Sequence, residues 1–163
     1  MIILEGIKMS ETNVCFRRAN FNDLVSMIKL LKDDSLGQFR EDYPTEILDE
    51  RYQRAFAAID QDPNQLLVVG ILEGDVIATA QLTFIPGLSR FGAWRGQIEG
   101  VRVASKFRGR GIGHAMINDL VDRCQKRGCS LVQLTSDKSR ERAHSFYEQL
   151  GFKASHEGFK RAI

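Results

Sequence analysis

The sequence contains few of the residues that cross-link small proteins or bind metals. Its 163 residues include only three cysteines and three histidines. Cys15, Cys124 and Cys129 form no CxxC pair, which excludes a disulfide framework and favours reduced thiols packed as small hydrophobes in a cytoplasmic protein. The histidines have no pair at metal-ligand spacing, so we expect no metal site.

The sequence also lacks an excess of one charge and any long apolar run. A net charge of +2, without a basic stripe or a helix-turn-helix signature, argues against a nucleic-acid binder. No segment approaches the ~20 apolar residues of a membrane-spanning helix, and the start has no signal-peptide pattern. We interpret residues 1–8 as a loose extension, with Met9 as an alternative start. Because repeats and linkers are absent, we expect one domain over residues 1–163.

Hydrophobic periodicity and turn residues predict a mixed α/β domain. Gly100 lies inside a predicted strand, which indicates a β-bulge or a close backbone approach. The predicted elements are a strand (14–19), a helix (20–34), a helix capped by Thr45 (45–62), a hairpin turning at Gly74-Asp75 (65–85), a strand (95–105), a helix (111–127), a strand (130–136), a helix (139–150) and a closing hairpin (152–162).

The segment KFRGRGIGHA, residues 106–115, combines three glycines with three cations between a predicted strand and a predicted helix. Amide N–H groups at a helix start, together with the helix dipole, form an anion site. Glycine lets the backbone approach an anion closely, and arginine adds positive charge. The segment therefore predicts a phosphate or pyrophosphate site.

Three phosphate-binding patterns compete for this segment. A Walker A loop ends in Gly-Lys-Ser/Thr, whereas this one ends Gly-Ile-Gly-His. A dinucleotide fingerprint needs GxGxxG early in the chain, whereas GxGxG stands here late in the chain. The third pattern, Arg/Gln-x-x-Gly-x-Gly/Ala, is matched by Arg108, Gly111 and Gly113. A glycine-rich turn that only links strand to helix is the plain structural alternative.

A second motif, RAHSFYEQLGF at 142–152, follows the glycine turn after one helix and one strand. Together the two motifs resemble the GNAT family of N-acetyltransferases, and within it a small bacterial subgroup of acetyltransferases described from sequence alone. The resemblance is strong over 97–152 and weaker towards the N-terminus. It implies the GNAT fold: a mostly antiparallel, twisted sheet of about six to seven strands, splayed at the acetyl-CoA site and flanked by about four helices.

The resemblance implies acetyl-CoA as co-substrate. The glycine turn would bind its pyrophosphate, and the preceding strand would pair with the pantetheine arm, with the splay between residues 100–103 and 131–136. The 3′-phosphate could use Lys106, Lys138 or Arg140. Many family members have asparagine at the position of Arg140. An arginine there cannot accept the hydrogen bonds that an asparagine oxygen accepts. The implied cofactor-binding residues are Val101, Arg102, Val103, Arg108, Gly109, Arg110, Gly111, Ile112, Gly113 and Arg140.

Acyl transfer to an amine needs a base and an acid, because an alkylamine is protonated at neutral pH and the leaving thiolate needs a proton. In GNAT proteins a tyrosine at the place of Tyr147 points to the CoA sulfur, and a glutamate often stands on the strand that carries Glu99. We assign Tyr147 as acid and Glu99 as base, directly or through water. Strand alternation puts Gln97, Glu99, Val101 and Val103 on one face.

The acceptor pocket is expected between the first two helices, their loop and residues 84–94. Acidic residues flank that loop and hint at a cationic amine: Asp33, Asp34, Glu41 and Asp42. Phe91 and Trp94 would form an apolar wall or a contact in a homodimer, which the family often forms. We expect an acetyl-CoA-dependent N-acetyltransferase that acts on the primary amine of a small molecule by direct attack in a ternary complex. The alternatives are a protein or peptide N-acetyltransferase and a non-catalytic acyl-CoA-binding regulator.

Overall fold

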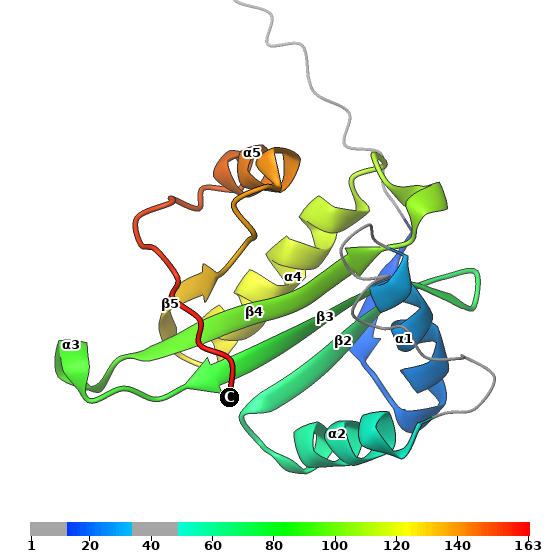
Figure 1. Ribbon diagram of the computed structural model, residues 1–163, viewed down its shortest axis with the longest axis horizontal. Helices are drawn as coiled ribbons and strands as arrows, with labels where there is room; N and C mark the ends of the chain where they lie inside the picture. The colour runs from blue at the N-terminus through cyan, green and yellow to red at the C-terminus, as the bar shows by residue number, and fades with distance from the viewer. Residues whose placement is uncertain (1–12, 34–48) are drawn as a thin grey trace, which may run out of the picture.

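The computed structural model describes residues 13–33 and 49–163 (Figure 1). Short 3₁₀ turns precede α1 and the glycine turn, at Phe21–Asp23 and Ser105–Phe107. The helices and strands are β1 (Cys15–Arg18), α1 (Leu24–Lys32), α2 (Glu50–Gln61), β2 (Gln65–Leu72), β3 (Asp75–Ile85), α3 (Ser89–Gly92), β4 (Trp94–Val103), α4 (Ile112–Lys126), β5 (Cys129–Leu134) and α5 (Glu141–Gln149).

The described strands form one sheet in the order β1-β2-β3-β4-β5, antiparallel except for the parallel β4–β5 pair. The expected mixed, mostly antiparallel architecture is confirmed, with five strands in the described part rather than six or seven. The closing hairpin predicted at 152–162 is wrong. That segment has no strand and is exposed beyond Phe152, so it buries too little apolar surface to be held against the sheet (Figure 1).

The pairing of β4 with β5 stops half-way along β4. The register runs from Trp94 opposite Cys129 to Ile98 opposite Leu134, where β5 ends. Beyond that point β4 continues to Val103 and is paired with β3 alone. This is the predicted splay, and among the described strands it leaves one backbone edge of residues 99–103 without a partner.

A β-bulge interrupts β4 at Gly100, as predicted. Gln81 pairs with Glu99 but Thr79 pairs with Arg102, so β4 carries one extra residue between the two pairs. Gly100 adopts φ +61°, a conformation that favours glycine. The extra residue reverses the alternation, so the assignment of Val101 and Val103 to the face of Glu99 is wrong: both pack against the apolar cluster on the α4 face. Arg102 takes that face instead.

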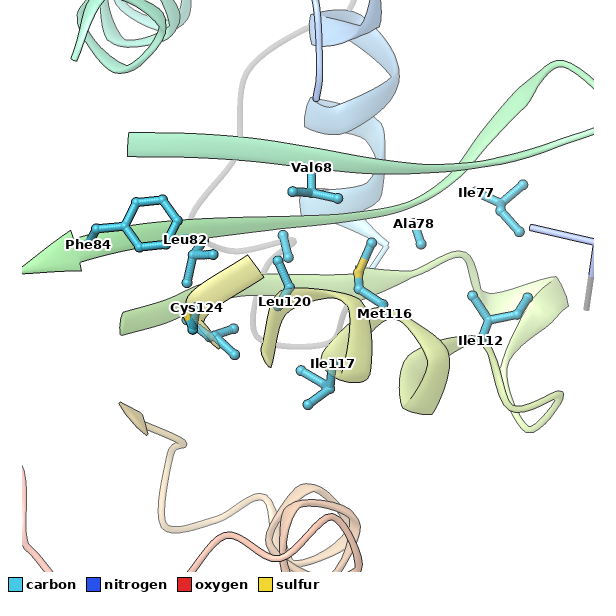
Figure 2. Packing of buried hydrophobic residues seen from close by; sticks show 12 residues of the cluster. Val68, Ile77, Ala78, Leu82, Phe84, Ile112, Met116, Ile117, Leu120 and Cys124 are labelled. Carbon is cyan, nitrogen blue, oxygen red and sulfur yellow. The ribbon is translucent and has the colours of Figure 1, made fainter. Parts of the chain in front are cut away.

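Each face of the sheet carries its own apolar core. On one face, α4 packs its buried side chains onto strands β2, β3 and β4 at the four-residue spacing that the sequence predicts (Figure 2). On the opposite face, α1 and α2 cover Val69 with side chains that include Leu24, Met27, Ile28 and Phe56. The α4 face has the larger cluster: Val68, Ile77, Ala78, Ala80, Leu82, Phe84, Ile98, Ile112, Met116, Ile117, Leu120 and Cys124.

Several element ends differ from the predicted ones for local reasons. The first helix begins with a 3₁₀ turn, where Asn20 and Asp23 form a capping box. In the hairpin, Glu73 and Gly74 both have positive φ and form the turn, so Asp75 already belongs to β3. The helix predicted from Thr45 is described from Glu50, after the Asp49 cap, and the residues before 49 lie outside the described part.

Gly96 of β4 lies directly against Cys124 of α4. A Cβ atom added there would overlap Cys124 Sγ and lie 3.4 Å from Leu82 Cδ1. We therefore expect Gly96→Ala to lower the free energy of unfolding by about 1–3 kcal/mol, the usual cost of overpacking a core. Chemical denaturation measures this change.

The pair Gly96→Ala and Cys124→Ala tests the cause. Removing the thiol makes room for the new methyl group, so the double variant should lose less stability than the two single losses added together. Simple additivity would contradict the overlap with Cys124.

Candidate active site

The glycine turn joins the open end of β4 to α4. Gly109 (φ +74°) and Gly111 (φ +80°) are left-handed, and Gly111 is the N-cap residue of α4. A Cβ at either position would touch nothing within 4 Å, so backbone conformation rather than space requires glycine. The turn is exposed where residues 108–111 run.

The start of α4 presents backbone donors at this turn. The helix's hydrogen bonding begins with Ala115 N, which donates to Gly111 O at 3.0 Å. By helix geometry the N–H groups of Ile112, Gly113 and His114 precede that bond and point out of the helix start. The turn therefore has the donors and the dipole that an anion site requires.

The third glycine of the motif has a different role. A Cβ on Gly113 would lie 3.3 Å from the Phe146 ring of α5, which is closer than most side chains tolerate. The His114 ring contacts the same phenylalanine edge-on, with centroids 4.8 Å apart. Gly113 thus allows α5 to pack against the first turn of α4, beside the glycine turn (Figure 1).

The cations of the turn are already engaged in different ways. Lys106 and Arg110 lie over the Phe107 ring, 4.9 and 5.4 Å from its centroid. Arg108 Nε donates to the Val103 carbonyl at 2.9 Å, so its guanidinium is held at the end of β4. Lys138, a candidate for the 3′-phosphate, forms an exposed ion pair with Glu157 at 3.1 Å.

Tyr147 lies on α5 and packs against the core of the α4 face. Its ring stacks edge-on between Phe146 and Phe152, with centroids 5.1 and 5.9 Å away. Burial raises the pKa of the Tyr147 phenol above its ordinary value, and the positive charges of Arg102 and Arg140 act in the opposite direction. The phenol is therefore protonated at neutral pH and lies within the field of two cations that would stabilise a neighbouring negative charge.

Glu99 lies on β4 where the pairing with β5 has just ended, and its side chain is exposed. Its partner Gln81 belongs to the sheet face that α1 and α2 cover elsewhere. Tyr147 packs on the α4 side, so the two predicted catalytic residues approach the splay from opposite faces. The bulge puts Arg102 on the same face as Glu99, although the charge of Arg102 also acts on Tyr147.

The sequence analysis missed a polar row that crosses the sheet beside Glu99. The register places four polar residues opposite one another on successive strands, from β2 to β5. Thr83 Oγ1 donates to Gln65 Oε1 at 2.8 Å, and Gln133 Nε2 donates to Gln97 Oε1 at 2.7 Å. No local pattern shows such a row, because its members meet only through strand register. The four residues are Gln65, Thr83, Gln97 and Gln133.

The predicted acceptor pocket is only partly described. Asp33 is engaged within the protein, since its carboxylate accepts from Ser105 N at 2.6 Å, and Asp34, Glu41 and Asp42 lie outside the described residues. The apolar wall of Phe91 and Trp94 is wrong. Trp94 packs on the α4-face core under Arg127, whereas Phe91 is fully exposed in α3, at the opposite end of β4 from the glycine turn (Figure 1).

The cysteines of the described part do not form a reactive centre. Cys124 is completely buried in the core, and burial raises the pKa of its thiol to about 12. The predicted packing role is confirmed for Cys124 and Cys129 is half-buried, but the prediction is wrong for Cys15, which is exposed in the edge strand β1. Within residues 13–33 and 49–163, no three His, Cys, Asp or Glu side chains gather as metal ligands. None of the helices described there has the length and apolarity to span a membrane.

Comparison with known proteins finds relatives among N-acetyltransferases. Over 81 residues the chain is 40% identical to glucosamine 6-phosphate N-acetyltransferase of Trypanosoma brucei brucei, a match that covers 50% of this chain and 53% of that protein. Over 114 residues it is 28% identical to aminoalkylphosphonate N-acetyltransferase of Salmonella typhimurium, covering 70% of this chain and 73% of that protein. The chain thus spans about half the length of the first relative and about three quarters of the second.

A solved structure extends the similarity to nearly the whole chain. The crystal structure of a transcriptional regulator from Bacillus halodurans C-125 is 46% identical, with a TM-score of 0.88, and the match covers 92% of this chain and 99% of that one. Residues 27–152, which include α2, the strands β2 to β5, the glycine turn and Tyr147, match the acetyltransferase (GNAT) family. The chain therefore belongs to the GNAT family of acetyltransferases.

Proposed function

We propose that this protein transfers the acetyl group of acetyl-CoA to the primary amine of a small molecule, by direct attack in a ternary complex. One observation carries the proposal: the unpaired edge of β4 at residues 99–103 leads directly into the left-handed glycine turn and the start of α4. An extended arm ending in a pyrophosphate fits this arrangement, with the arm along the strand edge and the anion at the helix start.

In the proposed cofactor site, Val101, Arg102 and Val103 offer their backbone groups to the pantetheine arm. Residues 108–113 surround the pyrophosphate. The Val103 carbonyl already accepts from Arg108, so pairing at that residue is left to its N–H group. Arg140 stands at the start of α5, close enough for its charge to act on Tyr147.

The chemistry follows from the two faces of the splay. Glu99 takes a proton from the ammonium group of the acceptor, either directly or through water. The free amine then attacks the thioester carbon, and the C–N bond forms as the C–S bond breaks. Tyr147 gives its phenolic proton to the departing thiolate, and its raised pKa keeps that proton available at neutral pH. The acylated nitrogen still carries one proton too many, which it loses through water, and this proton restores the Tyr147 phenol. Glu99 releases the first proton to solvent, so the net products are the amide, CoA thiol and one proton.

The small-molecule acceptor is supported by two relatives, whose names specify glucosamine 6-phosphate and aminoalkylphosphonate as acceptors. Both compounds are small primary amines that also carry an anionic group. On the Glu99 face, Arg102 offers a cation and the row around Gln97 offers uncharged hydrogen-bonding groups. An acceptor screen should therefore begin with amino sugars, their phosphates and aminoalkylphosphonates.

A regulatory acyl-CoA-binding module is the second candidate, favoured by the words "transcriptional regulator" in the name of the 46% identical structure. A protein or peptide acceptor is a further alternative. Thiol release in the screen separates the three. Turnover with free amines supports our proposal, turnover with peptides alone supports the second kind of enzyme, and binding of acetyl-CoA with no turnover supports the regulator.

The first experiment is calorimetric titration of the protein with acetyl-CoA, alongside Gly111→Glu. The substitution places a carboxylate and a strained left-handed residue at the proposed pyrophosphate site, so we expect binding to fall at least about 100-fold. Gly74→Glu, a left-handed glycine of the β2–β3 turn with nothing within 4 Å, is the matched control and should bind normally. Absence of binding to the unmodified protein would refute the proposed function.

Tyr147→Phe tests the acid. We expect kcat to fall about 10²- to 10³-fold with KM values little changed, because the phenol acts only on the leaving thiolate. The acid must be protonated to act, and burial raises the pKa of Tyr147. The unmodified enzyme should therefore lose activity through this group only above pH ~10, the ordinary range of a phenol. This loss should be absent in Tyr147→Phe. Phe152→Leu, in contact with the same ring, controls for packing. Equal kcat values for Tyr147→Phe and the unmodified protein would remove Tyr147 from the mechanism.

Glu99→Gln tests the base. We expect a fall in kcat of about 10²-fold for alkylamines at neutral pH, because the ammonium group keeps its proton. An acceptor that is already unprotonated at neutral pH, such as an acylhydrazide or hydroxylamine, should restore most of the rate. Glu73→Gln, an exposed carboxylate in the β2–β3 turn, should behave as the unmodified protein. An equal loss with both acceptor types would show that Glu99 does not act as a base.

A further inference from the structure

The side chain of Asp33, which is distant in sequence, contacts the segment that leads into the glycine turn. Asp33 is the residue that ends α1. Its carboxylate accepts a hydrogen bond from Ser105 N at 2.6 Å and lies 3.7 Å from the Arg108 guanidinium, and its backbone carbonyl accepts from the same guanidinium. Seventy-two residues of sequence separate Asp33 from Ser105, so this is a long-range tertiary contact.

Arg108 completes the link. Besides its bonds to Asp33, its Nε donates to the Val103 carbonyl at 2.9 Å, so one guanidinium joins the end of α1 to the end of β4. The intervening 3₁₀ turn is closed by Phe107 N on Ala104 O at 2.8 Å. Residues 103–108 are therefore fixed from both sides, immediately before the left-handed Gly109 and Gly111.

We propose that Asp33 is a positioning residue for acetyl-CoA binding, and that Arg108 works as its structural partner rather than as a ligand of the pyrophosphate. This inference rests on the proposed function. Backbone N–H donors bind an anion well only when they are held pointing at it. Glycine residues lose the most conformational entropy when the chain becomes ordered, so a glycine turn that is not held in place binds weakly. The link between Asp33, Ser105 and Arg108 holds the first half of the turn, so less order has to be created when the anion binds.

The two possible roles of Arg108 predict opposite effects of removing the Asp33 carboxylate. If Arg108 were a phosphate ligand, the carboxylate would compete with the phosphate for the guanidinium, and its removal would tighten binding. If Arg108 positions the turn, removal of the carboxylate loosens the turn and weakens binding. The sign of the change therefore decides between them.

The test is calorimetric titration of acetyl-CoA into Asp33→Ala, Asp33→Asn, Arg108→Ala and the double variant Asp33→Ala/Arg108→Ala. We expect Asp33→Ala to weaken binding about tenfold, the size expected for a lost charge-assisted hydrogen bond. Asp33→Asn should lose less, because its amide oxygen can still accept from Ser105 N. The double variant should bind no more weakly than Arg108→Ala, because both substitutions break one link. Tighter or unchanged binding by Asp33→Ala would overturn the inference.

Steady-state kinetics separates positioning from general damage. The KM for acetyl-CoA should rise in Asp33→Ala, while kcat and the KM for the amine stay within about twofold of the unmodified protein. Asp60→Ala, which removes another exposed aspartate paired with an arginine, should change neither binding nor kinetics. An equal fall of kcat for every acceptor would indicate a structural defect and overturn the inference.

The two proposals fail in different ways. If the unmodified protein binds no acetyl-CoA, the proposed function fails and this inference falls with it. If the unmodified protein binds and turns over acetyl-CoA but Asp33→Ala behaves identically, only the positioning role is lost.

Discussion

The unfinished pairing between β4 and β5 is the constraint on which the rest of the site depends. Backbone N–H and C=O groups need hydrogen-bond partners, and an unpaired strand edge is a template for another extended chain. Here β5 ends at Leu134 while β4 continues to Val103, so part of one central strand edge is left open. The core beneath does not depend on that edge, because β4 is still paired with β3 along this stretch and covered by α4. The open edge is therefore compatible with a stable sheet.

The bulge at Gly100 determines which side chains meet at that edge. Without the extra residue, Arg102 would lie on the α4 face and Val103 on the face of Glu99. With it, Val103 joins the apolar α4 side, where Ile98 and the half-buried Tyr147 also pack. Glu99 and Arg102 then share the opposite face, which α1 and α2 cover elsewhere, beside the Gln97–Gln133 hydrogen bond. One added residue in the strand thus brings Arg102 to the same face as the proposed base Glu99.

The sequence predicted those features that local rules determine and missed those that depend on register. The apolar periodicity predicted the core residues of α4, and the glycines predicted the turn and the bulge. Each of these signals depends only on residues that are close together in the sequence. The face of Val103 was assigned wrongly because the number of extra residues in a bulge is known only from the pairing of two strands. The polar row across the sheet could not be found for the same reason. The predicted C-terminal hairpin failed because residues 153–163 are exposed and bury too little apolar surface to be held against the sheet.

The glycine turn shows why a motif does not define the role of each of its residues. At Gly111 the left-handed backbone before α4 favours glycine. Gly113 lies inside the helix, where a larger side chain would crowd the Phe146 ring. Arg108, which the pattern assigns to the pyrophosphate, is bonded to Val103 and to the end of α1. These contacts divide the motif into residues whose backbone would face the proposed pyrophosphate and residues that hold the turn against α1, β4 and α5. A phosphate site built from backbone donors needs both groups, because the donors themselves sit on the most flexible residues of the turn.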